Sequence, residues 1–317
     1  MKVFISRPIP DTYHNLLYKP GFKVDIYEKD EICPRKELLK RVRGVDGVIS
    51  QWEDFIDRGF FEAAGPQLKI VANYATGFDR VDVSEAKKRG IIITNTAFPA
   101  FHHSVAEGAI ALLMAVAKRT PKLYNNIKEG KAVEFSPNRD LGIALMGKTT
   151  GVVGPGNIGG KLAKKMHDGF DNKILYFSRT HKKDLEENID AKKVSLNKLF
   201  SNSDFIFISI PGNESTKDLI SREQLSLMKK NAILVSTSAP SVLDEKALVK
   251  ALKNKKIYGA ALDIYSPNVK PLPDDNLILT AATGCSDMDS MQTMAKLCVQ
   301  NTANVLTGKN PITPVMG

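Results

Sequence analysis

The stretch of sequence that decides the fold is Thr149-Thr150-Gly151-Val152-Val153-Gly154-Pro155-Gly156-Asn157-Ile158-Gly159. Its first five residues are rich in β-branched side chains and predict a buried strand. The residues from Ile158 to Met166 follow a helical spacing and predict a helix. A turn with the glycine spacing G-x-G-x-x-G joins the two elements. This order of strand, glycine turn and helix predicts the first unit of a Rossmann fold, which binds a dinucleotide.

The three glycines of this turn have separate physical roles. Gly154 permits the tight turn, Gly156 lets the backbone approach a pyrophosphate, and Gly159 lets the helix pack closely on the strand. Asn157 and Ile158 open the helix, whose N-terminal N–H groups attract an anion. The alternative is a glycine-rich turn that binds no ligand.

The next predicted strand, residues 173–177, ends where a Rossmann fold reads the ribose of its cofactor. An acidic residue at this point accepts a hydrogen bond from the 2′-hydroxyl of NAD and repels a 2′-phosphate. This chain has Ser178-Arg179-Thr180 there, and no carboxylate. Ser178 and Thr180 can donate hydrogen bonds, and Arg179 can bind a phosphate through two parallel hydrogen bonds. The sequence therefore favours NADP over NAD, with a solvated basic turn as the alternative.

Short apolar runs alternate with helical patterns on both sides of a long apolar segment that we expect to be a helix from Ser104 to about Arg119. This alternation predicts two α/β domains with parallel sheets, and 317 residues suffice for two. A final helix is expected from Asp287 to Leu306. Strands are expected at residues 2–5, 22–27, 47–50, 68–72, 91–94, 149–153, 173–177, 204–210, 232–236, 257–262 and 277–280.

Composition narrows the possible partners and the cellular location. The formal charge is +10, but the lysines are scattered and no aromatic residues interleave them, so a nucleic-acid or other polyanion partner is disfavoured. No apolar run reaches the roughly 18 residues of a membrane span, and the N-terminus reads as a strand. Three cysteines without a C-x-x-C pair fit the reducing cytoplasm, and no metal site is predicted.

Several separated segments, in the right order, resemble the D-isomer-specific 2-hydroxyacid dehydrogenases, and among them the glyoxylate/hydroxypyruvate reductase branch. The segment Val71 to Asp79 is similar to the family's N-Y-A-V-G-Y-D, and Arg89 to Thr96 to its R-G-I-x-V-T-N-T. Ser104 to Glu107 opens the family's long helix, and Gly147 to Gly159 resembles G-K-T-I-G-I-V-G-x-G-x-I-G. The resemblance covers nearly the whole chain.

The resemblance implies an architecture and an activity. A flavodoxin-like, discontinuous substrate domain is formed by residues 1–98 and 286–317, and a Rossmann domain by residues 99–285. Relatives of this type form homodimers through the helix that starts near Ser104, and transfer hydride between a nicotinamide cofactor and a small 2-oxoacid or 2-hydroxyacid. The residues that the resemblance assigns to the substrate are Tyr74, Thr76 and Gly77. Those that it adds to the cofactor site are Pro211, Thr216, Thr237, Ser238 and Asp263.

The chain departs from the family at its three catalytic positions. The family's arginine, which holds the substrate carboxylate, is replaced by Ala239. The histidine that exchanges the substrate proton is replaced by Ala282, and the glutamate that orients it by Asn268. A shifted alignment cannot restore the set, because no histidine follows His181 and no glutamate follows Glu245.

Other groups can be considered as substitutes. His102 and His103 precede the long apolar pattern and are candidates for a proton relay, with ordinary interface or surface histidines as the alternative. Cys285 is interpreted as a buried, inert thiol rather than a reactive one. Asp263 is interpreted as a site residue, with a strand-end carboxylate as the alternative. Three functions follow: an NADP-dependent oxidoreductase with altered catalysis, a non-catalytic NADP-binding sensor, and, last, a polyanion-binding protein.

Overall fold

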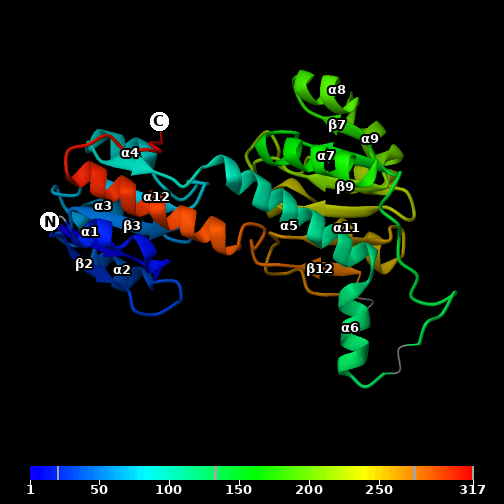
Figure 1. The fold of residues 1–317 in the computed structure, drawn as a ribbon, viewed down its shortest axis with the longest axis horizontal. Helices are drawn as coiled ribbons and strands as arrows, with labels where there is room; N and C mark the ends of the chain where they lie inside the picture. The colour runs from blue at the N-terminus through cyan, green and yellow to red at the C-terminus, as the bar shows by residue number, and fades with distance from the viewer. Residues whose placement is uncertain (20, 132–133, 274–275, 316–317) are drawn as a thin grey trace. The chain divides into compact units, whose positions relative to one another are not determined.

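The computed structural model describes residues 1–19, 21–131, 134–273 and 276–315, and the chain divides into two compact units (Figure 1). The first unit combines Met1–Pro99 with Asp287–Gly317, and the second is Ala100–Ser286. The first unit is therefore discontinuous in sequence, because the last helix of the chain returns to it.

The first unit is built on a five-stranded parallel sheet. Its strands are β1 (Lys2–Ile5), β2 (Lys23–Ile26), β3 (Gly47–Gln51), β4 (Ile70–Tyr74) and β5 (Ile92–Thr94). Their order in the sheet is β2-β1-β3-β4-β5. This is the flavodoxin-like order, so the fold class expected for this unit is confirmed.

Helices cover both faces of this sheet, as a parallel sheet requires. One face packs against α1 (Asn15–Tyr18) and α12 (Met288–Leu306), and the other against α2 (Arg35–Arg41), α3 (Arg58–Ala64) and α4 (Val83–Lys88). The side chains alternate accordingly. In β1, Val3 and Ile5 contact the first set of helices, while Phe4 between them contacts the second.

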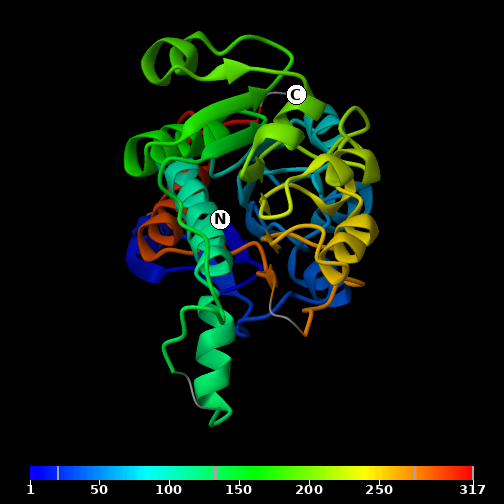
Figure 2. The same cartoon turned by 90° about the vertical axis from the view of Figure 1, so that its right-hand side faces the viewer.

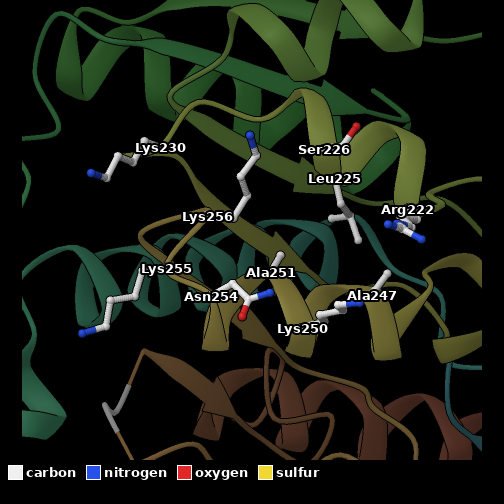
Figure 3. A pocket seen from close by; sticks show the side chains of 10 residues that line it. All are labelled: Arg222, Leu225, Ser226, Lys230, Ala247, Lys250, Ala251, Asn254, Lys255 and Lys256. Atoms are coloured by element: carbon white, nitrogen blue, oxygen red, sulfur yellow. The ribbon is translucent and has the colours of Figure 1, made fainter.

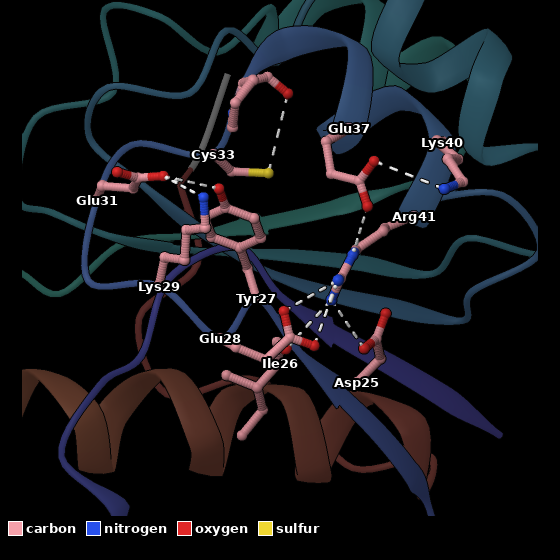
Figure 4. Close-up of polar contacts among 11 residues, drawn as sticks. Asp25, Ile26, Tyr27, Glu28, Lys29, Glu31, Cys33, Glu37, Lys40 and Arg41 are labelled. Atoms are coloured by element: carbon pink, nitrogen blue, oxygen red, sulfur yellow. Dashed lines mark hydrogen bonds and ion pairs between the residues drawn. The ribbon is translucent and has the colours of Figure 1, made fainter.

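A polar network around Arg41 ties α2 to the edge strand β2 (Figure 4). The Arg41 guanidinium donates to Glu37 Oε1 at 2.9 Å, to Asp25 Oδ1 at 3.1 Å and to Glu28 Oε2 at 3.0 Å. It also donates to the Ile26 carbonyl at 3.2 Å. The hydrogen bond from Arg41 is the main cause that holds the pKa of Glu37 below its usual value. The network therefore holds α2 against β2 and engages the Ile26 carbonyl at the edge of the sheet.

The second unit is built on a seven-stranded parallel sheet. Its strands are β6 (Thr149–Val153), β7 (Lys173–Phe177), β8 (Lys192–Lys193), β9 (Phe205–Ile208), β10 (Ile233–Ser236), β11 (Gly259–Leu262) and β12 (Leu277–Leu279). Their order is β12-β11-β10-β9-β6-β7-β8. Numbered from β6, this is the Rossmann order 3-2-1-4-5-6 with one further strand, which confirms the predicted fold class.

Two apolar cores cover the faces of this second sheet. One contains residues of α5 (Pro99–Ala117), α7 (Asn157–Phe170) and α8 (Lys183–Ile189). The other contains residues of α9 (Leu196–Asn202), α10 (Arg222–Leu227) and α11 (Glu245–Lys253). Strand residues alternate between the two cores, as Val152 and Val153 do in β6.

The long helix α5 corrects one expectation from the sequence. It begins at Pro99 and not near Ser104, so His102 and His103 lie inside the helix. Proline is favoured in the first turn of a helix, where its missing N–H group leaves no hydrogen bond unmade. Among the described residues, α5 alone is long and apolar enough to cross a membrane by length and composition. However, Ala106, Leu113 and other side chains of α5 are buried in the core of the second unit.

The helix α6 (Thr120–Lys128) follows α5 and extends away from the sheet (Figures 1 and 2). It contains no buried residue. Tyr124 and Ile127 on this helix are 61% and 62% exposed. Phe135, in the segment after it, is 96% exposed. Within the chain, these apolar side chains have little packing.

Candidate cofactor and substrate sites

The predicted cofactor residues lie at one edge of the seven-stranded sheet. Gly154, Ser178, Thr237 and Asp263 directly follow the last residues of β6, β7, β10 and β11, and Pro211 comes three residues after β9. All these strands are parallel, so their carboxyl ends meet at the same edge. The structure thus brings together residues that lie more than a hundred positions apart in the sequence.

The glycine turn has the geometry that a dinucleotide requires. Gly154 has a φ of +86°, and a Cβ there would lie 2.2 Å from Ile210 Cγ2. A Cβ on Gly159 would lie 2.3 Å from the Gly154 carbonyl oxygen. By contrast, a Cβ on Gly156 would meet no atom within 4 Å. Gly154 and Gly159 are therefore required by the packing of the chain. Gly156 borders open space at the N-terminus of α7, so the residues fit a dinucleotide.

Hydrogen bonds to its backbone shape the turn after β7, which the sequence predicts to contact the ribose of the cofactor. Lys193 Nζ donates to the Arg179 carbonyl at 3.2 Å, and Ser178 Oγ donates to the Thr180 carbonyl. Within the described parts of the chain, the Arg179 guanidinium forms no ion pair. Arg179 is exposed, so its guanidinium group is accessible to an anionic ligand.

Sequence reasoning missed a hydrogen-bonded group beside this turn. Tyr176 Oη donates to Glu186 Oε1 at 2.5 Å, and His181 Nδ1 lies 2.7 Å from the same oxygen. The Lys182 N–H donates to Tyr176 Oη at 2.9 Å. These residues come from a strand, a turn and a helix, and no sequence spacing signals that they meet.

Hydroxyl groups fix the loops after β9 and β10. Thr216 Oγ1 donates to the Pro211 carbonyl at 2.7 Å. The Ile210 N–H donates to Ser238 Oγ at 2.9 Å, and Thr237 Oγ1 donates to the Ile208 carbonyl at 3.3 Å. The predicted cofactor residues Thr216, Thr237 and Ser238 therefore shape the backbone at this edge, whether or not they also contact a cofactor.

The three positions that the resemblance aligns with the family's catalytic groups lie on the segments that follow β10, β11 and β12. Asn268 and Ala282 are exposed, and Ala239 is half-buried. Ala282 has a φ of +56°, which is uncommon for a residue with a side chain. A Cβ on Gly212 would lie 2.6 Å from the Cβ of Ala239. None of the three side chains can donate a proton or hold a carboxylate by charge.

The Asp263 carboxylate is occupied by the loop that contains Ala282. Asp263 Oδ1 accepts from Thr280 Oγ1 at 2.7 Å and from the Thr283 N–H at 2.9 Å. Its Oδ2 accepts from the Gly284 N–H at 3.2 Å. Asp263 is only 5% exposed, so these hydrogen bonds hold the loop in place. A role for Asp263 toward the cofactor stays a prediction.

His102 and His103, the candidate proton donors, lie in an environment that disfavours their protonated forms. Burial, and then the nearby Lys161, lower the pKa of His102. Burial, Lys161 and Lys165 lower the pKa of His103. Both histidines are therefore poor proton donors near neutral pH, although a relay through them stays a prediction. Cys285 is half-buried, so the expectation that it is buried is wrong.

In the first unit, the loop after β4 presents backbone donors. The carbonyl groups of residues 75, 76 and 77 accept hydrogen bonds from the Thr96 N–H at 2.9 Å, Asn95 Nδ2 at 2.8 Å and Asn73 Nδ2 at 2.8 Å. The N–H groups of Thr76 and Gly77 donate to no atom of the described residues. A loop with its carbonyls engaged and its N–H groups open is suited to a carboxylate.

Two aromatic residues flank this loop. The Tyr74 hydroxyl donates to the Met291 carbonyl at 2.7 Å, so it anchors α12. Trp52, which the sequence analysis did not single out, is 40% exposed, and its Nε1 lies 4.0 Å from the position of a Cβ on Gly77. The Arg80 guanidinium stacks on the Trp52 ring at 4.7 Å. The loop therefore has an aromatic wall on one side.

A basic groove between α10 and α11 bears on the polyanion hypothesis (Figure 3). Its volume is about 610 Å³, and its apolar lining includes Leu225 and Ala251. Basic side chains also line this groove, but Figure 3 shows Lys230 and Lys255 extending to one side and Lys256 in another direction. These cations do not converge on one point, as the cations of a built anion site do.

Comparison with known proteins agrees with this geometry. Residues 110–284 match the family model described as "D-isomer specific 2-hydroxyacid dehydrogenase, NAD binding domain". The chain is 38% identical to a glyoxylate reductase of Pyrococcus furiosus, over 99% of this chain and 95% of the relative. The chain belongs to the D-isomer specific 2-hydroxyacid dehydrogenase family. Its similarities fall on the glyoxylate reductase branch.

Two solved structures have the same fold as this chain. The TT0316 protein from Thermus thermophilus has a TM-score of 0.91 and 33% identity, with both chains covered in full. The NADPH-dependent glyoxylate/hydroxypyruvate reductase from Sinorhizobium meliloti, in complex with citrate, has a TM-score of 0.80 and 27% identity. The alignment covers 99% of this chain and 97% of that one. These similarities support a nicotinamide dinucleotide as the cofactor.

Proposed function

We propose that this protein is an NADP-dependent oxidoreductase of the 2-hydroxyacid dehydrogenase type, with impaired or altered catalysis. The observation that carries the proposal is the glycine turn, in which Gly156 leaves open space at the N-terminus of α7. The glyoxylate reductase relatives support a small 2-oxoacid or 2-hydroxyacid as the substrate. The open N–H groups of Thr76 and Gly77 suit its carboxylate.

The choice of NADP rests on the turn after β7. Arg179 is exposed and forms no ion pair in the described parts of the chain, and no carboxylate belongs to the turn itself. A guanidinium group binds a phosphate by two hydrogen bonds, whereas NAD offers only a hydroxyl at this point. The similar reductase from Sinorhizobium meliloti is described as NADPH-dependent.

Impaired catalysis follows from the residues at the three catalytic positions. Loss of a positioned acid or base typically lowers a rate by about 10²–10⁴. Loss of an electrostatic anchor for the reacting group lowers it by about 10²–10³. These factors do not multiply when the groups act as a unit. With alanine at positions 239 and 282 and asparagine at 268, the usual mechanism has none of the three.

The same three residues favour a second candidate function, a non-catalytic NADP-binding sensor or regulatory protein. Such a protein needs the cofactor turn but no proton donor. It would bind NADPH with ordinary affinity and turn over none of the substrates of the family. A change in shape or association on binding the cofactor would then carry the function.

We further propose that the protein is a cytoplasmic homodimer. Six of the 19 residues of α5 are exposed, including Met114 at 42%, and α6 has no buried residue. Exposed Tyr124, Ile127 and Phe135 form apolar surface of the kind that a second copy covers. The cysteines are free thiols, as is usual in the reducing cytoplasm. Sedimentation of the wild type against Tyr124→Glu/Ile127→Glu tests the dimer, and a monomeric wild type would contradict it.

One assay separates the two candidate functions. Purified protein is mixed with NADPH or NADH and with glyoxylate, hydroxypyruvate, pyruvate or phenylpyruvate. Loss of absorbance measures turnover, and cofactor binding is measured in parallel. Slow turnover with NADPH supports the impaired enzyme, and tight binding without turnover supports the sensor. Arg179→Gln should weaken NADPH binding about tenfold and leave NADH unchanged. Turnover at the level of ordinary relatives would contradict impaired catalysis, and tighter binding of NADH would contradict the choice of NADP.

A further inference from the structure

The network of Tyr176, Glu186 and His181 lies beside the turn that reads the cofactor ribose, and neither the resemblance nor the comparisons assign it a role. Tyr176 is fully buried in the core of the second unit, while the His181 side chain is 65% exposed. Glu186 bridges the two, with both partners on its Oε1. A buried tyrosine thus fixes the position of an exposed imidazole through one carboxylate.

The hydrogen bonds determine which nitrogen of His181 carries a hydrogen. The hydrogen bond from Tyr176, and then that from His181, keep the pKa of Glu186 below its usual value, so this carboxyl group is ionised and only accepts. Because Nδ1 of His181 is the nitrogen beside Glu186, Nδ1 carries the hydrogen in the neutral ring. The other nitrogen, Nε2, is then a bare acceptor.

Protonation of His181 changes its Nε2 atom from a hydrogen-bond acceptor to a donor. The neutral ring presents a lone pair at Nε2, which repels a phosphate oxygen. The protonated ring presents an N–H donor and a positive charge at the same place. His181 lies two residues after Arg179, in the turn where a 2′-phosphate is recognised.

We infer that His181 is a second cation for the 2′-phosphate of NADP, held in place by Glu186, and that it makes the preference for NADP over NAD depend on pH. This inference rests on the proposed NADP-dependent function and adds a specificity-determining residue to it. The contribution of Arg179 to the preference for NADP does not change with pH, because its guanidinium stays charged. The contribution of His181 is present while the ring is protonated and is lost as the pH rises.

The charged groups around His181 are of both signs. Glu186 on α8 is an anion, and its Oε1 lies 2.7 Å from His181 Nδ1. Arg179 and Lys182 are cations of the same turn, and Lys193 on β8 donates to the Arg179 carbonyl. Tyr176 stays neutral in this range, because burial and its bond to Glu186 raise its pKa.

The test measures the dissociation constants of NADPH and NADH at pH 5.5, 7.0 and 8.5 by fluorescence titration. NADH controls for every part of the cofactor except the 2′-phosphate. We expect the ratio of the NADH constant to the NADPH constant to fall about three- to tenfold from pH 5.5 to 8.5, since one exposed charge-assisted hydrogen bond is lost. The phosphate gains charge near pH 6, which acts in the opposite direction and cannot imitate this fall.

Two variants isolate the contribution of His181. In His181→Gln, the ratio should no longer fall as the pH rises. His167→Gln is the matched control: His167 also pairs with a carboxylate, Asp168 at 2.9 Å, but lies in the last turn of α7, at the far end of that helix from the glycine turn. It should keep the wild-type pH profile. Thermal unfolding checks that both variants are folded.

A third variant tests the positioning role of Glu186. In Glu186→Gln the ring loses the ionised carboxylate that accepts its Nδ1 hydrogen and holds it in place, so NADPH should bind more weakly than to the wild type at pH 5.5, as in His181→Gln, with NADH binding unchanged. Wild-type affinity for NADPH at pH 5.5 in a folded Glu186→Gln would overturn the role of Glu186. The same pH profile in the wild type and in His181→Gln would overturn the inference, while the choice of NADP stands. No preference for NADPH at any pH would overturn both.

Discussion

Two regions at the same edge of the second sheet differ in what they retain. The turn between β6 and α7 has all three glycines of its motif, while the loops after β10, β11 and β12 have Ala239, Asn268 and Ala282 at the positions that the resemblance aligns with the catalytic side chains of the family. The reason is structural. A side chain at Gly154 or Gly159 would overlap its neighbours, so packing requires glycine at both positions. Asn268 and Ala282 are exposed, and the fold does not depend on what they carry. If the proposed function holds, the cofactor turn is fixed by packing, while the proposed catalytic positions are not.

The largest effect is expected from restoring the lost groups. The triple variant Ala239→Arg/Asn268→Glu/Ala282→His should raise kcat/KM for glyoxylate with NADPH by about 10²–10⁴. Histidine tolerates the positive φ of residue 282 better than bulky β-branched residues do. Steady-state kinetics measure the gain. Ala282→His alone should gain little, because the groups act as a unit. No gain in a folded triple variant would show that the loss lies elsewhere.

The next test separates packing from ligand binding within the glycine turn. Gly156→Ala adds a methyl group to open space, so the protein should keep its stability and bind NADPH at least about tenfold more weakly. Gly159→Ala forces a Cβ against the Gly154 carbonyl and should lower the free energy of unfolding by about 1–3 kcal/mol. Calorimetry and cofactor titration measure the two effects. Equal cofactor affinity in Gly156→Ala and the wild type would contradict the assigned site.

A smaller effect is expected at Asp263, whose carboxylate accepts hydrogen bonds from the loop of Ala282. Asp263→Asn would place an amide N–H₂ group against one of the donors of the loop, Thr283 or Gly284. This should destabilise the loop by about 1–2 kcal/mol and increase its hydrogen exchange. The control is Asp190→Asn, whose side chain is 89% exposed and pairs only with Lys192. Unchanged exchange at residues 280–284 would show that the carboxylate does not hold this loop.

The smallest effect is expected at the two histidines of α5. Because burial and nearby lysines lower the pKa of each, neither is protonated to a useful extent at pH 7. The double variant His102→Gln/His103→Gln should therefore change any residual turnover less than about threefold. Its cofactor affinity should match that of the wild type. A loss of tenfold or more, with binding unchanged, would restore the proton relay as an explanation.

Local patterns in the sequence were sufficient to predict the two parallel sheets of the fold. Alternating strands and helices predict both parallel sheets, and the order of strands confirms them. The start of α5 was misplaced because the residues between Pro99 and Ser104 show no clear helical spacing. Helices such as α8 and α9 were not predicted, because seven residues carry too little periodicity.

The sequence by itself determined the dinucleotide turn, the family and the proposal that the usual catalytic groups are missing, because each rests on a short-range pattern or on a residue identity. Only the tertiary structure decided that Asp263 holds the loop of Ala282, and that Tyr176 and Glu186 orient His181. These contacts join residues on different strands, helices and loops. Their partners are chosen by the packing of the sheet and not by spacing along the chain.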